Sequence, residues 1–148
     1  GELILAGHIT ATSIMMRYAA LLSALLLWIP NPALGEWTEI GSSRGPEEFI
    51  LYADPLKLPD EHRIVVSFPH LKQFTQARVH PGTGRLIRSV IVDADYDCHL
   101  ERERIVATTA YEGGMGRGAV VATEPGDGQW TAIARGDLRM LLWQAACR

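Results

Sequence analysis

The chain has 148 residues, 47% of them hydrophobic, and a formal net charge of −3. So mild a charge provides neither the basic footprint of a nucleic-acid-binding protein nor a polybasic patch for a membrane surface. No repeat, heptad pattern or low-complexity tract divides the sequence, and Gly and Pro cluster at turns rather than in a linker.

Residues 16–35 have the pattern of a secretory signal peptide. A positive start precedes the apolar run 18–29, which is shorter than the roughly 20 residues of a membrane span. Two prolines then end any helix, and Ala33 and Gly35 are small residues of the kind that a signal peptidase reads. We therefore expect cleavage before Glu36, with an uncleaved N-terminal anchor or a buried core helix as the alternatives.

This signal divides the chain into three parts. Residues 1–15 precede it and are interpreted as upstream read-through or a start site placed too early. Residues 36–148 form the mature chain, which is long enough for one domain with one modest core. No cysteine lies near Gly35 to carry a lipid, so we expect no lipid anchor. Cleavage removes the apolar run, so we also expect no membrane span in the mature domain. It would lie in the periplasm, at the cell surface or outside the cell.

The mature part alternates short apolar segments with turn residues, which is typical of an antiparallel sheet. Strands are predicted at 37–40, 49–52, 63–68, 71–77, 88–98, 103–111 and 119–123. We expect Gly41 to Ser43 to end the first strand, and Pro69 to mark an edge position or a bulge. With 63–68 and 71–77 counted as one interrupted strand, the sheet has about five to six strands.

Segment 88–98 carries the clearest strand signal, because its side chains alternate between two faces. One face takes the apolar set of Val90, Val92, Ala94, Tyr96 and Cys98, and the other takes Ser89, Ile91, Asp93, Asp95 and Asp97. Residues 103–111 are expected to return beside this strand as a hairpin. Cys98 thus lies on the apolar face, where a structural disulfide belongs.

Residues 137–146 are predicted to form a closing helix. Leu138, Leu141, Leu142 and Ala145 recur at helical spacing and make one apolar stripe. Asp137 suits the N-cap or the first turn of this helix. The predicted fold is therefore α+β, with a C-terminal helix packed on one face of an antiparallel sheet.

The two cysteines of the chain are predicted to form a disulfide. Cys98 lies on the apolar face of its strand and Cys147 just past the end of the helix, so packing the helix on the sheet brings them together. Closing a loop of about 50 residues stabilises a fold by roughly 4 kcal/mol in the chain-entropy model. In an oxidising compartment this pairing also removes the cysteines as nucleophiles.

Three aspartates, Asp93, Asp95 and Asp97, superficially resemble a calcium loop. An EF-hand needs glycine at its sixth position and glutamate at its twelfth, and those positions hold Cys98 and Arg104 here. We therefore interpret the run as a solvated strand face that pairs across the hairpin with Arg102 and Arg104. A loose divalent-ion site on this face is the alternative.

The glycine-rich segment 113–118 could be read as a phosphate loop. Such a loop must lead into a helix, whereas the residues that follow, 119–123, are strand-like. A tight turn or a bulge is therefore the favoured interpretation.

No catalytic, cofactor-binding or metal-binding residue is assigned from the remaining motifs. His62, His70, His80 and His99 show no metal-ligand spacing. A hydrolytic triad built on Ser67 or Ser89 stays open, although no motif supports it. Of the tryptophans after the signal, Trp143 is expected in the core or an interface. Core packing is also the favoured role of Trp37 and Trp130, with partial exposure at a protein contact as the alternative.

Several short motifs follow one another in an order that resembles a known family. They are Glu36-Trp37-Thr38-Glu39-Ile40-Gly41, Tyr52-Ala53-Asp54, Tyr96-Asp97-Cys98, the segment from Tyr111 to Val121 with its Met115-Gly116-Arg117-Gly118 turn, and a terminal helix ending Ala146-Cys147. They cover essentially the whole mature chain, which resembles the surface-adhesin protein E family of bacterial envelope proteins.

This resemblance implies an antiparallel sheet packed with a C-terminal helix, a cysteine pair joining the two, and a tendency to form a homodimer. A member of the family is a lipid-anchored adhesin that binds host extracellular-matrix proteins and epithelial cells, whereas no anchoring cysteine is found here. We therefore expect an exported, non-enzymatic domain without a cofactor that binds a protein partner. The resemblance suggests extracellular-matrix proteins as the partner class. The alternative is a small periplasmic metal-binding or hydrolytic domain that uses the Asp93, Asp95 and Asp97 face.

Overall fold

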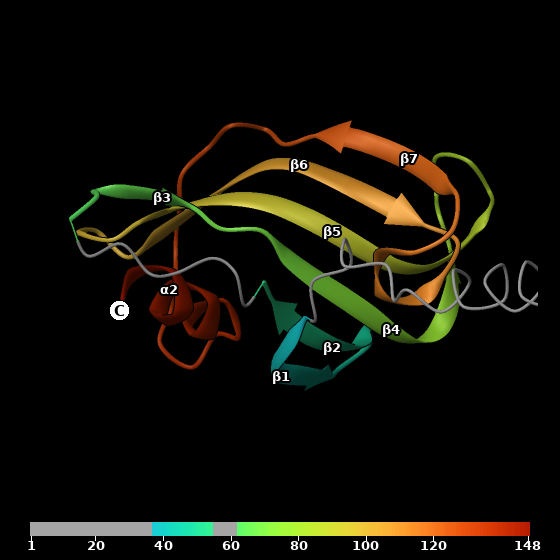
Figure 1. Cartoon of the computed structure of the whole chain (residues 1–148), viewed down its shortest axis with the longest axis horizontal. Helices are drawn as coiled ribbons and strands as arrows, with labels where there is room; N and C mark the ends of the chain where they lie inside the picture. Colours follow the sequence, from blue (N-terminus) through green and yellow to red (C-terminus); the bar gives the residue numbers. More distant parts are fainter. Residues whose placement is uncertain (1–36, 55–61) are drawn as a thin grey trace, which may run out of the picture. The chain divides into compact units, whose positions relative to one another are not determined.

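The computed structural model describes residues 37–54 and 62–148. The predicted upstream segment 1–15 and signal peptide 16–35 lie outside this part. The strands are β1 (Thr38–Arg44), β2 (Glu48–Ala53), β3 (Val65–Ser67), β4 (His70–Val79), β5 (Leu86–Asp97), β6 (Arg102–Tyr111), β7 (Val120–Pro125) and β8 (Thr131–Ala132); the helices are the 3-10 turn η2 (Gly114–Gly116) and α2 (Arg139–Cys147) (Figure 1). Within the described ranges, no helix is long and apolar enough to cross a membrane.

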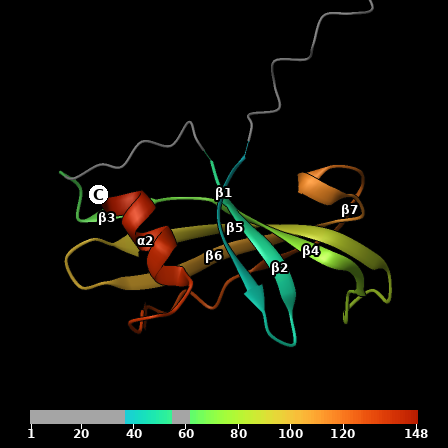
Figure 2. The ribbon, with the colours of Figure 1, turned by 90° about the horizontal axis from the view of Figure 1, so that it is seen from below.

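All strands belong to one antiparallel sheet. Its main path has the order β1-β2-β4-β5-β6-β7, while β3 pairs with β5 and β8 pairs with β6. Figure 2 shows α2 beside the end of the sheet that carries β3. The six-stranded path and the C-terminal helix confirm the α+β prediction. β8 was missed because two residues are too few to show an alternating pattern.

The first strand is longer than predicted. Gly41 was expected to begin a turn, but β1 continues to Arg44 with a bulge near Gly41. A Cβ atom at Gly41 would lie 2.9 Å from Cδ1 of both Leu138 and Leu141. This glycine therefore serves the close approach of β1 to α2, and the turn prediction was wrong.

Pro69 lies between β3 and β4, outside both strands, while β5 continues past both of them. Proline lacks the N–H that a central strand needs. The interruption therefore divides one extended segment into β3, which pairs with β5, and β4, which lies between β2 and β5.

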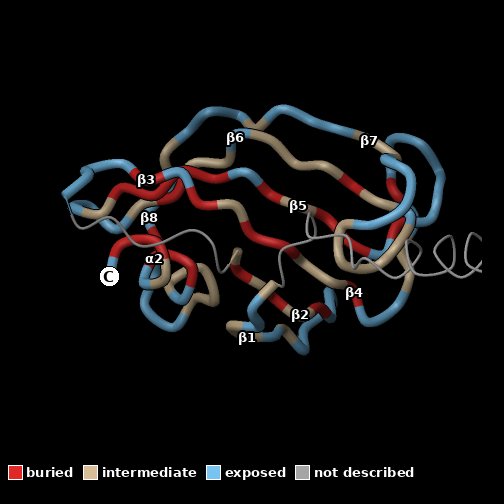
Figure 3. Tube along the Cα trace, in the orientation of Figure 1, coloured by how far each residue is buried: buried red, intermediate tan, exposed pale blue. Residues whose placement is uncertain are grey.

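The predicted alternation of β5 is confirmed and places the core. The face of the sheet that α2 covers, called here the helix-covered face, carries a continuous buried cluster. From β5 it takes Val90, Val92, Ala94 and Tyr96, and from α2 it takes Leu142, Trp143, Ala146 and Cys147. Figure 3 shows these buried segments along β5 and α2. A disulfide joins Cys98 to Cys147, with 5.5 Å between their Cα atoms, and this confirms the predicted staple.

The helix begins later than predicted and buries a different stripe. Its N-cap is Leu138, while Asp137 precedes it and accepts the backbone N–H of Arg139 at 2.9 Å. Leu141, assigned to the buried stripe, is 39% exposed, whereas Trp143 is buried. The indole N–H of Trp143 donates to the carbonyl oxygen of Asp97 at 2.8 Å. The need to place this indole against β5 accounts for the rotated stripe.

Candidate functional site

The predicted acidic face of β5 forms ion pairs instead of an open site. Asp95 Oδ2 lies 2.6 Å from Arg104 Nη2, and Asp97 Oδ2 lies 2.7 Å from Arg102 Nη2. These residues are directly opposite one another on β5 and β6, so the predicted cross-strand pairing is confirmed. The predicted solvation holds for Asp93 but is wrong for Asp95 and Asp97, which are 9% and 4% exposed.

Trp130 covers the two arginines of this face. Its ring lies 4.6 Å from the guanidinium carbon of Arg104 and 5.2 Å from that of Arg102, within cation–π range. Within residues 37–54 and 62–148, no group of three or more His, Cys, Asp or Glu side chains is placed to hold a metal ion. The face is thus an Asp–Arg–Trp stack, in which charges are compensated internally.

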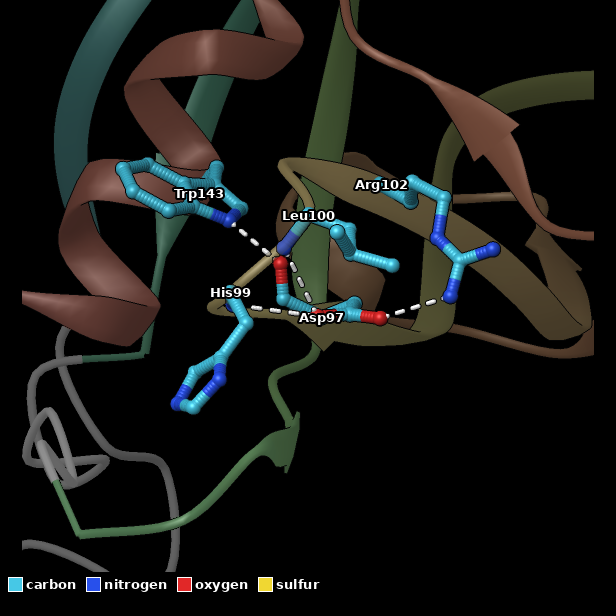
Figure 4. A network of polar contacts seen from close by, with 5 residues as sticks. All are labelled: Asp97, His99, Leu100, Arg102 and Trp143. Carbon is cyan, nitrogen blue, oxygen red and sulfur yellow. Dashed lines mark hydrogen bonds and ion pairs between the residues drawn. The ribbon is translucent and has the colours of Figure 1, made fainter.

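Asp97 connects the turn, the strand and the helix (Figure 4). Its Oδ1 accepts the backbone N–H groups of His99 and Leu100 at 3.0 and 2.9 Å. Its Oδ2 accepts Arg102, and its carbonyl oxygen accepts Trp143. The hydrogen bond from Arg102, with those from the turn, holds the pKa of Asp97 below its ordinary value. This aspartate is therefore structural, because all its acceptor groups serve the fold.

The glycine-rich segment 113–118 is a tight turn, as predicted, and leads into β7. The hydroxyl of Ser89 donates to the carbonyl oxygen of Gly113 at 2.6 Å and accepts the N–H of Gly116 at 2.9 Å. The N–H of Met115 donates to Oε1 of Gln73 at 2.7 Å. These N–H groups therefore bind the sheet rather than a phosphate.

Two alanine substitutions separate backbone strain from crowding in the loops. Gly116 has a φ of +69°, and a Cβ there would lie 2.8 Å from Cδ1 of Ile91; Gly128 has a φ of +71° and nothing within 4 Å. Gly128→Ala is expected to cost about 1 kcal/mol, and Gly116→Ala at least about 1 kcal/mol more. Urea unfolding measures both, and equal losses would contradict the packing role of Gly116.

The serines considered for a hydrolytic triad serve the fold. Ser67 donates to Oδ1 of Asp95 at 2.7 Å, and Ser89 holds the glycine turn. His80 lies 3.3 Å from both Thr83 Oγ1 and Glu124 Oε1. His62 and His99 are exposed, whereas His70 lines a cavity. Among the described residues, these contacts give no support to a triad.

A cavity of about 470 Å³ opens on the helix-covered face, and we call it the sheet pocket. Its walls come from β2, β4, β5, β6 and the start of α2. The apolar part includes Phe49, Leu51, Phe74, Val90, Val92 and Leu142. Side chains two residues apart on one strand share a face, which is why β4 contributes His70, Lys72 and Phe74 together. The volume falls within the range of pockets that hold ligands.

Two polar side chains of the sheet pocket are almost fully buried. Glu103 is 5% exposed and its Oε2 has no hydrogen-bond partner; His70 is 3% exposed and its Nδ1 has none. Burial raises the pKa of Glu103. Burial, aided by the charge of Lys72, lowers the pKa of His70 to about 3. The imidazole is therefore neutral near neutral pH, and the carboxyl retains its proton to higher pH than an exposed glutamate.

The other charged groups of the sheet pocket already have partners. Asp137 Oδ2 lies 2.7 and 2.9 Å from Nη2 and Nε of Arg139, and this contact lowers the pKa of Asp137. Glu47 lies 2.6 Å from Arg78. Lys72 Nζ lies 5.0 Å from the centre of the Phe49 ring.

Sequence reasoning missed the sheet pocket, although one signal was present. Glu103 lies opposite Tyr96 in the hairpin, and Tyr96 belongs to the predicted apolar face. A residue opposite an apolar-face residue points to the same side. The register of the hairpin would therefore have placed one charged side chain among core residues.

Replacing Glu103 by Gln is expected to raise the free energy of unfolding at pH 7 and to leave it nearly unchanged at about pH 4. The raised pKa means that the folded wild type is stabilised by protonation below the unfolded pKa, and that this stability is lost as pH rises through the folded pKa. Chemical unfolding at several pH values measures the difference. Glu39→Gln, at an exposed position of β1, is the control, and a pH-independent difference would contradict the burial of this carboxyl.

Comparison with known proteins identifies the family to which the chain belongs. Residues 37–148 match the family model of surface-adhesin protein E. A structure of Haemophilus influenzae protein E is 16% identical, has a TM-score of 0.56, and covers 78% of this chain and 86% of its own. A structure of protein E from non-typeable Haemophilus influenzae has the same identity and TM-score and covers 78% and 77%. No curated protein matches significantly. At such identity these structures establish the fold alone, while the family model spans most of the sequence. The chain therefore belongs to the surface-adhesin protein E family.

Proposed function

We propose that this protein is exported to the bacterial envelope and binds another protein there, through the sheet pocket and without catalysis. The observation that carries the proposal is the pocket itself, where two buried polar side chains among apolar walls each have one atom without a hydrogen-bond partner. Interfaces gain most of their binding energy where one side chain fills such a desolvated pocket. Membership of an adhesin family supports a protein as the ligand.

Export is supported by two separate features of the chain. Residues 16–35 have the pattern of a signal peptide, and we propose residues 36–148 as the mature domain. Its two cysteines form a disulfide, which is the form expected in an oxidising compartment. The periplasm, the cell surface and the medium are all oxidising compartments of this kind.

A binding role accounts for the pocket chemistry better than catalysis does. The hydroxyl in its lining belongs to Thr108, and the two cysteines are joined to each other. Ser67 and Ser89 bond within the fold on the other face. Nucleophilic catalysis needs a nucleophile within hydrogen-bond reach of a base, whereas neither His70 Nδ1 nor Glu103 Oε2 has a hydrogen-bond partner among the described residues.

Filling the sheet pocket tests the proposal. Thr108 lines the pocket, whereas its neighbour Thr109 lies on the opposite face, where its hydroxyl contacts Thr123 at 3.4 Å. We expect the wild type and Thr109→Tyr to bind immobilised extracellular-matrix proteins and epithelial cells, and Thr108→Tyr to bind at least tenfold more weakly. Melting temperature and a free-thiol assay show that each variant is folded. Unchanged binding by Thr108→Tyr would contradict a role for the pocket, and no binding by the wild type would contradict this partner class.

A further inference from the structure

We propose that the sheet pocket receives a lysine side chain of the protein partner, with the ammonium group against the carboxylate of Glu103 and the methylene stem against the apolar walls. The inference rests on the proposed protein-binding function, since it names the group that the partner inserts. It follows from three features of the described residues: a buried carboxyl oxygen without a hydrogen-bond partner, charged neighbours that form no ion pair with it, and its small exposed area.

Glu103 occupies a position that otherwise suits an apolar residue. It lies opposite Tyr96 on the helix-covered face, is 5% exposed, and its Oε2 accepts no hydrogen bond. A buried polar group that lacks a partner destabilises the folded state. A buried carboxyl of this kind brings no benefit to a core that only stabilises the fold. In a binding site it has a use, because a ligand that donates a hydrogen bond to the carboxylate removes the free-energy cost of burying it.

The charges around the pocket favour a cation at Glu103. Arg139 is paired with Asp137 and Glu47 is paired with Arg78. The charges of Arg139 and Lys72 act on Glu103, but neither side chain forms an ion pair with it. Lys72 is half-buried at the wall, where its ammonium lies over the Phe49 ring, a favourable contact. Glu103 is therefore the lining carboxyl without an ion pair. Lys72 opposes an incoming cation, and its removal should tighten binding.

Access to Glu103 suits lysine better than arginine. Glu103 is 5% exposed and its Oε2 is buried, so little of the carboxyl is open to a ligand. A compact ammonium needs little space for its contact, whereas a guanidinium gains its advantage from a bidentate contact with both oxygens. The methylene stem of lysine can lie along apolar surface while its charged end is placed elsewhere, and Phe74 and Leu142 supply that surface.

Three six-carbon probes separate the contributions of charge and stem: n-hexylamine, 1-hexanol and hexanoate. Each is titrated into the ¹⁵N-labelled disulfide-bonded domain, and backbone chemical shifts are followed. We expect saturable shifts with n-hexylamine at Val92, Thr108 and Leu138, and binding weaker by at least tenfold with 1-hexanol and with hexanoate. Glu103→Gln is expected to weaken n-hexylamine binding at least tenfold, Lys72→Gln to strengthen it, and the exposed control Glu39→Gln to leave it unchanged.

Preference for hexanoate, equal binding of n-hexylamine by Glu103→Gln, or no saturable binding would each overturn lysine recognition. Each of these results leaves the protein-binding proposal standing if Thr108→Tyr still binds the partner at least tenfold more weakly than the wild type. Conversely, partner binding that survives Thr108→Tyr contradicts the proposed function whatever the small probes show. The melting temperatures of Glu103→Gln, Lys72→Gln and the control Glu39→Gln are compared, so loss of fold is recognised separately from loss of binding.

Discussion

The double variant Cys98→Ala/Cys147→Ala is expected to unfold with a free energy lower by about 4 kcal/mol than that of the oxidised wild type. The cysteines are 49 residues apart, so the disulfide closes a long loop and restricts the unfolded chain. It also joins the end of β5 to the end of α2, on the face where the core packs. A whole domain has about 5–15 kcal/mol of stability, so the loss is a large share. Urea unfolding of both proteins measures it.

Reduction of the wild type provides the matched control, because it breaks the same bond without changing a side chain. The reduced wild type and the double variant are expected to unfold at similar urea concentrations. A double variant within about 0.5 kcal/mol of the oxidised wild type would show that the staple contributes little, and that packing alone holds α2 on the sheet.

Asp97→Ala is expected to lower the free energy of unfolding by about 3 kcal/mol. The substitution removes the acceptor of the His99 and Leu100 N–H groups and of Arg102, whose Nε is already buried without a partner. Asp93→Ala is the control on the same face of β5, where the side chain is exposed. We expect that control to change stability by less than about 0.5 kcal/mol.

The same aspartate gives the fold an acid sensitivity of known sign. Because the folded pKa of Asp97 is lowered, its contribution is present above the ordinary pKa of an aspartate and is lost as pH falls through the folded value. Asp97→Asn is expected to remove this part of the pH dependence. An Asp97→Ala variant as stable as Asp93→Ala, at neutral pH, would contradict the structural role assigned to the network.

Local patterns in the sequence were enough to predict much of the fold. The alternation along 88–98 identified the two faces of β5, because side chains on a strand have a strict period of two. The same alternation placed Cys98 near the covering helix, and the disulfide with Cys147 follows from that packing. The glycine segment 113–118 was identified as a turn, since a strand rather than a helix follows it.

Features that depend on contacts between distant segments were not predictable in this way. Asp95 and Asp97 were expected to be solvated, but Trp130 arrives from far along the chain to cover their arginine partners. Gly41 was expected in a turn, whereas it admits α2 against β1. The sheet pocket combines residues at the start of α2 with residues of β2, β4, β5 and β6, and no local pattern encodes that geometry.

The central claim is that the sheet pocket is where a partner protein is held. The most direct measurement is chemical-shift mapping of the ¹⁵N-labelled domain with an extracellular-matrix protein, the proposed partner class. We expect the perturbed residues to include Val92, Thr108 and Leu138, which line the pocket. Perturbation confined to Trp130 and Arg104, on the opposite face, would contradict the claim and move the binding site to the Asp–Arg–Trp stack.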